Sequence, residues 1–281
     1  MPGFNGLRVL SFESRRAKEI AQLITNNGGQ PMVAPSTRAV STPNPDEQKL
    51  IQGILKREFD AIIFMTGVGA RALIKAAEEL SSQEAFLSSL RQVFVIVRGP
   101  KPAAAMREFD VPVGLAVPEP NTWREILKSL DENTGHMPLK KVRIAIQEHG
   151  ESSPELYAAL RERGAEVFPA RVYRWELPED ISPLQRAIHA VVEGEVEVIM
   201  FTSSVQFVHA AKVASEMGLK EQFQAAVNRS LVASIGPIAS ETLRKNGIRV
   251  DLEPSHPKMG FLVRETAEKG AAIIAERQAN A

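Results

Sequence analysis

The chain contains two segments in which a run of apolar residues ends in a hydroxyl-bearing residue and a helical pattern follows at once. Residues 61–65 read AIIFM and end at Thr66, and residues 198–201 read VIMF and end at Thr202. Such runs predict parallel strands that are buried on both faces of a sheet. Because the N–H groups at helix starts bind anions, we expect two α/β domains that face one ligand.

Two extended segments bounded by prolines, at residues 36–45 and 168–178, divide the rest of the pattern. We therefore expect two domains, each a doubly wound parallel sheet, joined by a two-stranded connector. The first domain comprises residues 1–37 and 177–281, and the second, inserted domain comprises residues 41–171. The expected strands lie at residues 7–12, 31–35, 61–66, 93–97, 113–117, 142–146, 166–168, 196–201, 231–234 and 249–252.

Composition narrows the class of protein. The chain has 281 residues, 44% of them hydrophobic, and 34 basic residues balance 34 acidic ones, so no net charge attracts nucleic acid or a membrane. The absence of cysteine excludes disulfides, thiolate catalysis and cysteine-bound zinc, and fits a reducing compartment. The first residues lack the pattern of a secretory leader, and no apolar run reaches the about 18 residues of a membrane span. We expect a cytoplasmic protein. We also expect a monomer, because no sequence pattern indicates a dimer interface.

The turn after residue 65 matches a dinucleotide-binding fingerprint. Gly67, Gly69 and Ala72 satisfy G-x-G-x-x-A between a strand and a helix. The next strand, however, ends at Arg98, where an NAD site requires an acidic residue for the ribose. Three interpretations therefore stay open: an NADP-linked oxidoreductase, a tight turn without a ligand, and a cradle for another anion.

Further anion-binding groups follow neighbouring strands. Arg98 and Lys101 stand at the start of a helix, where cations destabilise the helix but can hold an external anion. Thr202, Ser203 and Ser204 offer more hydroxyls than one helix cap needs. Residues 234–237 (SIGP) again place a hydroxyl and a glycine between a strand and the start of a helix. We expect residues 66–69, 98–101, 203–204 and 234–236 to form one anion cradle.

Few residues have the spacing of a metal or nucleophile site. The histidines at 136, 149, 189, 209 and 256 lack metal-ligand spacing, so we expect no metal. Glu148–Glu151 follows a strand and is either an acid–base group or a solvated turn. Tyr173 lies in the second extended segment and either faces the ligand or packs against the connector.

Several of these motifs, in this order, resemble the uroporphyrinogen-III synthase (HemD-like) family. They are residues 13–16 (ESRR), 65–69 (MTGVG), 98–102 (RGPKP), 172–174 (VYR), 201–204 (FTSS), 233–237 (ASIGP) and 253–260 (EPSHPKMG). The resemblance covers nearly the whole chain. It implies a cofactor-free enzyme that binds a linear tetrapyrrole polycarboxylate, hydroxymethylbilane, and closes it to uroporphyrinogen III with loss of water and inversion of ring D.

The resemblance also implies roles for individual residues. The family's linker tyrosine, which assists departure of the substrate hydroxyl, falls on Tyr173. Many members have threonine shortly after the Gly-Pro turn, where this chain has Ser240. The candidate substrate-binding residues are Arg15, Thr66, Gly67, Gly69, Arg98, Lys101, Thr202, Ser203, Ser204, Gly236 and Ser240.

Two other functions stay open at this point. A non-catalytic sensor or regulator would keep the ligand site and bind a tetrapyrrole without converting it, and the departure at Ser240 favours this slightly. An NADP-linked oxidoreductase would use Gly67 and Gly69 for the cofactor.

Overall fold

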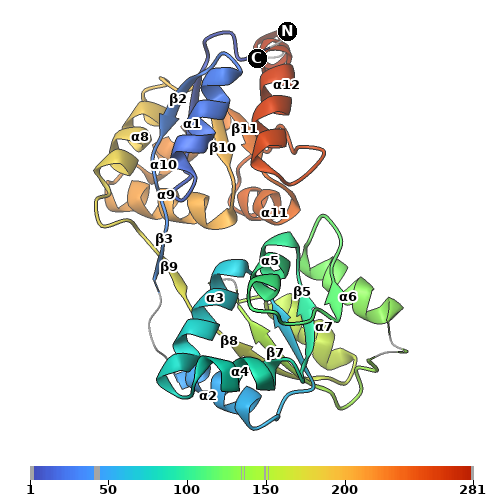
Figure 1. Ribbon diagram of the computed structural model, residues 1–281. Coiled ribbons are helices and arrows are strands. Elements are labelled where there is room, and N and C mark those ends of the chain that lie inside the picture. The colour runs from blue at the N-terminus through green and yellow to red at the C-terminus, as the bar shows by residue number, and fades with distance from the viewer. Residues whose placement is uncertain are drawn as a thin grey trace. The chain divides into compact units, whose positions relative to one another are not determined.

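A computed structural model describes residues 3–40, 45–133, 135, 137–148, 150 and 152–279. The chain forms two compact units (Figure 1), which we call the discontinuous unit (Met1–Arg38 and Glu176–Ala281) and the inserted unit (Ala39–Trp175). The boundaries expected from the sequence lie within a few residues of these.

The discontinuous unit is built on a parallel sheet with strand order β11-β10-β1-β2. In its register, Val9 of β1 lies opposite Val198 of β10 and Pro31 of β2. All residues of β10 and β11 are buried, as expected for continuous apolar strands. The strands are β1 (Arg8–Ser11), β2 (Gln30–Val33), β10 (Val198–Phe201) and β11 (Leu231–Ser234).

Helices cover both faces of this sheet (Figure 1). Leu10 and Ile199 share one apolar core with Leu184 of α8, whereas Val9 and Met200 share another with α1 and α12. Alternate residues of each strand therefore enter opposite cores, which confirms the doubly wound arrangement. The helices are α1 (Ala17–Asn26), α8 (Ser182–Val192), α9 (Ser204–Glu216), α10 (Lys220–Arg229), α11 (Pro237–Lys245) and α12 (Met259–Ala279).

The inserted unit repeats this architecture on a parallel sheet with order β6-β5-β4-β7-β8. Ile62 of β4 contributes to a core with α2 to α5, and Ile63 to a core with α6 and α7. The strands are β4 (Ala61–Phe64), β5 (Phe94–Val97), β6 (Leu115–Ala116), β7 (Arg143–Gln147) and β8 (Glu166–Ala170). The helices are α2 (Pro45–Leu55), α3 (Gly67–Ala76), the 3₁₀ turn η1 (Ala77–Glu79), α4 (Gln83–Leu90), α5 (Pro100–Glu108), α6 (Trp123–Glu132) and α7 (Pro154–Glu162).

A two-stranded sheet joins the parts of the chain that belong to the two units. β3 (Arg38–Val40) pairs with β9 (Arg174–Glu176), so the expected connector is confirmed. Arg38 forms ion pairs with Glu176 at 3.1 Å and with Glu179 at 2.5 Å. The part of the first connector segment at residues 41–44 lies outside the described residues.

Two expected segments differ from the structure. Residues 168–170 continue β8 inside the sheet, where Pro169 is accommodated because β8 is an edge strand. The expected strand at 249–252 is wrong, because only Leu252 forms a bridge, to Ala233. The Asp251 carboxylate accepts the Val232 N–H at 2.8 Å. In a regular strand pair a backbone carbonyl of the neighbouring strand would accept this N–H.

Candidate functional site

The turn at Thr66 joins the carboxyl end of β4 to the start of α3. Thr66 is the N-cap of α3, and its hydroxyl oxygen accepts the N–H of Gly69 at 3.0 Å. The same oxygen lies 3.2 Å from the phenol oxygen of Tyr173, which follows β8. A helix start, a threonine hydroxyl and a phenol therefore meet at the carboxyl edge of the inserted sheet.

Tyr173 is buried, with 3% of its surface exposed, and belongs to the core formed with α2 to α5. Its ring packs edge-on against Trp175, with the ring centroids 5.4 Å apart. The ring therefore packs in the connector region, and the hydroxyl reaches the Thr66 turn; that Tyr173 faces a ligand stays a prediction.

Arg98 directly follows β5 and is half-buried. Burial lowers the pKa of the Arg98 guanidinium, and its interaction with Tyr173 opposes that shift. Within the described part of the chain, the Arg98 side chain has no hydrogen bond or ion pair. Such a cation is suited to an external carboxylate. Lys101, in the first turn of α5, is exposed.

The fingerprint glycines lie against protein atoms. A Cβ on Gly67 would stand 2.6 Å from the carbonyl oxygen of Lys101, so Gly67 allows α3 and α5 to pack closely. A Cβ on Gly69 would stand 2.0 Å from the amide nitrogen of Gln147. The space beside both glycines is filled by the chain itself, which favours the tight-turn interpretation over a pyrophosphate site.

Sequence reasoning missed Gln147, which ends β7 and is fully buried. Its side-chain oxygen accepts the Thr66 N–H at 3.3 Å. Glu148 is not part of a solvated turn: it is buried, pairs with Arg171 at 3.4 Å and accepts a hydrogen bond from the Tyr157 hydroxyl. His149 and Glu151 of that motif lie outside the described residues. A polar residue that directly follows an apolar run is the signal that could have drawn attention to Gln147.

In the discontinuous unit, the three hydroxyls after β10 have different environments. The Thr202 hydroxyl donates to the Glu13 carboxylate, and its N–H donates to Gln206 at 2.8 Å. Ser203 and Ser204 are half-buried, and in the described part of the chain their hydroxyls make no hydrogen bond. Thr202 therefore stabilises the turn, whereas a ligand contact of Ser203 and Ser204 stays a prediction.

The turn after β11 provides another helix start. Gly236 is the N-cap of α11, and Pro237 occupies the first helical position. The Ser240 hydroxyl is buried and has no hydrogen-bond partner among the residues that the structure describes. Arg15, after β1, is exposed. That Ser240 takes over a contact of the usual threonine stays a prediction.

The candidate residues thus form two groups, each at the carboxyl edge of one sheet. Thr66, Gly67, Gly69, Arg98, Lys101 and Tyr173 belong to the inserted unit, and Arg15, Thr202, Ser203, Ser204, Gly236 and Ser240 to the discontinuous unit. That both groups bind one ligand stays a prediction. No group of three or more metal-ligating side chains occurs among the described residues, and none of the described helices is both long and apolar enough to cross a membrane.

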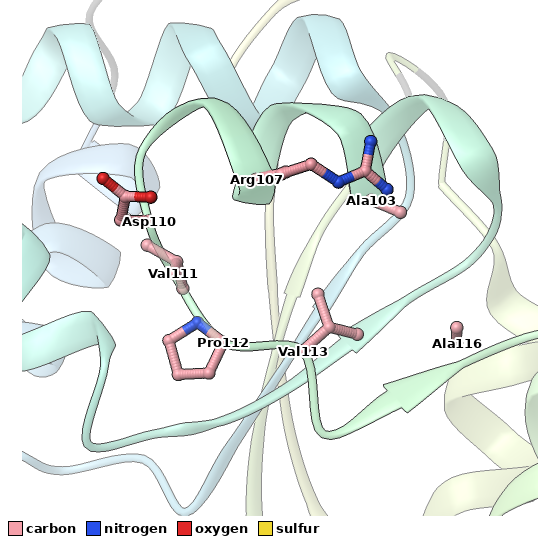
Figure 2. A pocket seen from close by; sticks show the side chains of 7 residues that line it. All are labelled: Ala103, Arg107, Asp110, Val111, Pro112, Val113 and Ala116. Carbon is pink, nitrogen blue, oxygen red and sulfur yellow. The ribbon is translucent and has the colours of Figure 1, made fainter.

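A separate hollow of about 550 Å³ lies beside α5 and the edge strand β6. Figure 2 shows the Arg107 side chain extending along α5 toward Ala103. Asp110 lies at the other side of the hollow. The hollow is lined by Ala103, Arg107, Asp110, Val111, Pro112, Val113 and Ala116. None of the candidate site residues is among them.

Comparison with known families supports one of the functions that the sequence left open. The family model described as "Uroporphyrinogen-III synthase HemD" matches residues 18–264, a span that includes parts of both units. The chain belongs to this family. The resemblance inferred from the motifs is confirmed, and with it an enzyme of tetrapyrrole synthesis that acts on a small molecule.

Individual relatives extend the comparison. The uncharacterized protein YjjA of Bacillus subtilis (strain 168) is 28% identical over 267 residues, which cover 95% of this chain and 97% of that protein. A crystal structure of a mutant uroporphyrinogen III synthase from Thermus thermophilus has a TM-score of 0.68 at 23% identity and covers 97% of this chain and 100% of its own. A uroporphyrinogen-III synthetase structure from Helicobacter pylori has a TM-score of 0.53 at 13% identity and covers 92% and 98%. These structures share the two-domain α/β fold.

Proposed function

We propose that the chain is a uroporphyrinogen-III synthase, a hydro-lyase that cyclises hydroxymethylbilane with inversion of ring D and loss of water. Family membership over residues 18–264 supports the reaction. The observation that links the chemistry to this chain is the hydroxyl pair of Thr66 and Tyr173 beside the half-buried Arg98. We further propose that the enzyme is a cytoplasmic monomer without a cofactor; its lack of cysteine fits a reducing compartment.

Tyr173 is the proposed acid. Thr66 already accepts the Gly69 N–H, and its own hydroxyl proton can point to the phenol oxygen of Tyr173. In that arrangement the phenol can donate its proton to the substrate hydroxyl, which leaves as water. The pyrrole nitrogen supplies the electrons that expel it and leaves an azafulvene cation. The proton lost when the last pyrrole regains aromaticity restores the phenol.

The substrate carboxylates are the proposed ligands of the helix starts. Donors of the required kind are Arg98, the hydroxyls of Ser203 and Ser204, and the N–H groups at the starts of α3, α9 and α11. Each charge-assisted bond contributes roughly 1.5–3 kcal/mol, so several can hold a flexible polyanion in one pose. Such a pose favours the spiro route, in which the substituted carbon of ring D is attacked first.

The comparisons favour neither of the two alternative functions. The packing of Gly67 against Lys101 and of Gly69 against Gln147 leaves no space beside these glycines for a pyrophosphate. The test of the proposal is incubation with freshly made hydroxymethylbilane, followed by separation of the I and III isomers of the product. A synthase yields isomer III, whereas a sensor or an oxidoreductase leaves the isomer I of spontaneous closure.

A further inference from the structure

Residues at and just after the end of strand β7 contact the Thr66 turn, the segment before Tyr173 and the Tyr173 ring. Gln147 is fully buried, and its side-chain oxygen accepts the Thr66 N–H at 3.3 Å. Its amide nitrogen donates to the carbonyl of Glu148 and occupies the space that a Cβ on Gly69 would need. The Gln147 side chain therefore fixes the turn whose threonine hydroxyl contacts Tyr173.

The next residue, Glu148, holds the segment that leads to Tyr173. Its backbone N–H donates to the carbonyl of Ala170 at 2.9 Å, and its carboxylate lies 3.4 Å from the Arg171 guanidinium. The Tyr157 hydroxyl donates to the same carboxylate and accepts the Ser153 N–H at 3.0 Å. A buried carboxylate with these partners restrains the chain two residues before Tyr173.

Gly150 lies against the aromatic rings of Tyr173 and Trp175. It has a φ of 88°, and a Cβ there would stand 2.6 Å from Cδ1 of Trp175 and 3.1 Å from Cε2 of Tyr173. The backbone after β7 therefore lies close to both aromatic rings, in a conformation that glycine adopts without strain.

We propose that Gln147 and Glu148 are positioning residues for Tyr173, Gln147 through Thr66 and Glu148 through Arg171. The inference deepens the proposed function, on which its catalytic part rests. Neither side chain is assigned a contact with substrate. Their role is to keep the phenol oxygen at the Thr66 hydroxyl, the position from which the proposed function has the phenol donate its proton.

The structural part is tested without substrate. Because the chain has only two tyrosines, the ¹³C-labelled tyrosine rings give signals that a Tyr157→Phe variant assigns. Gln147→Met keeps the length of the side chain and removes its hydrogen bonds, and it is expected to shift the Tyr173 signals. The matched control is Gln224→Met, which removes an amide that donates to the Asn246 carbonyl at 2.7 Å beside Gly247. Tyr173 signals unchanged in Gln147→Met would overturn the inference.

The catalytic part is tested with a double-mutant cycle. Gln147→Met is expected to lower kcat about 10-fold with KM changed less than about 2-fold, and to have an effect below about 2-fold in a Tyr173→Phe background. A merely structural role would lower kcat equally in both backgrounds, and that result would refute positioning. Should Gln147→Met not fold, Glu148→Gln is measured in the same cycle with the same expectation. If the wild type forms no isomer III, the proposed function fails, and the ring signals still decide the structural part.

Discussion

The hydroxyl oxygen of Thr66 lies 3.2 Å from the phenol oxygen of Tyr173, although the two residues are 107 positions apart in the chain. Thr66 follows the central strand β4 of the inserted sheet, and Tyr173 follows the edge strand β8. The same threonine oxygen accepts the Gly69 N–H at 3.0 Å. The helix start thereby orients the threonine, and the threonine orients the phenol.

Removal of the Tyr173 hydroxyl is expected to slow the reaction without abolishing it. Hydroxymethylbilane can ionise and close unaided, so Tyr173→Phe should lower kcat by about 10- to 100-fold, or roughly 1.4–2.8 kcal/mol. The product should stay mainly isomer III, because ring inversion depends on the pose of the substrate. Steady-state kinetics with isomer analysis provides the measurement, and circular dichroism checks the fold. Unchanged kinetics would leave Tyr173 with a packing role only.

Arg98 is expected to contribute to binding and not to stability. Because this half-buried cation has no acidic partner in the described residues, Arg98→Met should leave the free energy of unfolding unchanged or raise it. It should weaken binding of uroporphyrinogen III by about 10- to 100-fold, measured anaerobically by calorimetry. Lys56→Met is the control, since it removes an exposed cation that precedes the amino end of β4. Equal affinity in the two variants would remove Arg98 from the site.

Much of the fold follows from local pattern, and the exceptions have identifiable causes. The runs at 61–65 and 198–201 are long and continuously apolar, so they predict buried strands directly. The segment at 249–252 (RVDL) alternates charged and apolar residues; Asp251 accepts the Val232 N–H through its carboxylate, and only Leu252 forms a bridge. Such a side-chain bond depends on tertiary neighbours that a local pattern does not contain.

The site is predictable residue by residue but not as a set of contacts. The sequence indicates Thr66 as a hydroxyl-bearing residue between a strand and a helix, and Tyr173 as a residue of the second extended segment. Their hydrogen bond depends on the path of the chain through β7 and β8, which no local pattern fixes. Gln147 escaped prediction because a single glutamine at a strand end has no distinctive spacing.

Gly67 is expected to tolerate no side chain. In Gly67→Ala the Cβ would stand 2.6 Å from the Lys101 carbonyl oxygen, so α3 and α5 must separate. The free energy of unfolding should fall by about 1–3 kcal/mol, and the affinity for product should fall with it. Gly260→Ala in α12 is the matched control, because a Cβ there meets nothing within 4 Å. Denaturant titration of both variants gives the comparison, and equal stability would show that the close packing at Gly67 contributes nothing.

His209 is expected to make stability depend on pH. Burial lowers the pKa of His209 from its ordinary value of 6.5, although a hydrogen bond between Nδ1 and the Ser36 carbonyl at 2.7 Å opposes this. As the pH falls, the unfolded chain therefore binds the proton before the folded chain does. The contribution of neutral His209 to the free energy of unfolding is complete above pH 6.5 and is lost below it. The stability difference between wild type and His209→Gln should shrink from about pH 8 to about pH 5 in denaturant titrations. A difference that stays constant would exclude His209 as the titrating group.

The most direct test of the proposed activity is the isomer composition of the product formed from hydroxymethylbilane under anaerobic conditions. Catalysed closure competes with spontaneous closure, and only ring-D inversion on the protein gives isomer III. Wild-type protein is expected to yield mainly isomer III in proportion to enzyme concentration, without added metal or nucleotide. Product that remains isomer I at every protein concentration would contradict the proposed activity.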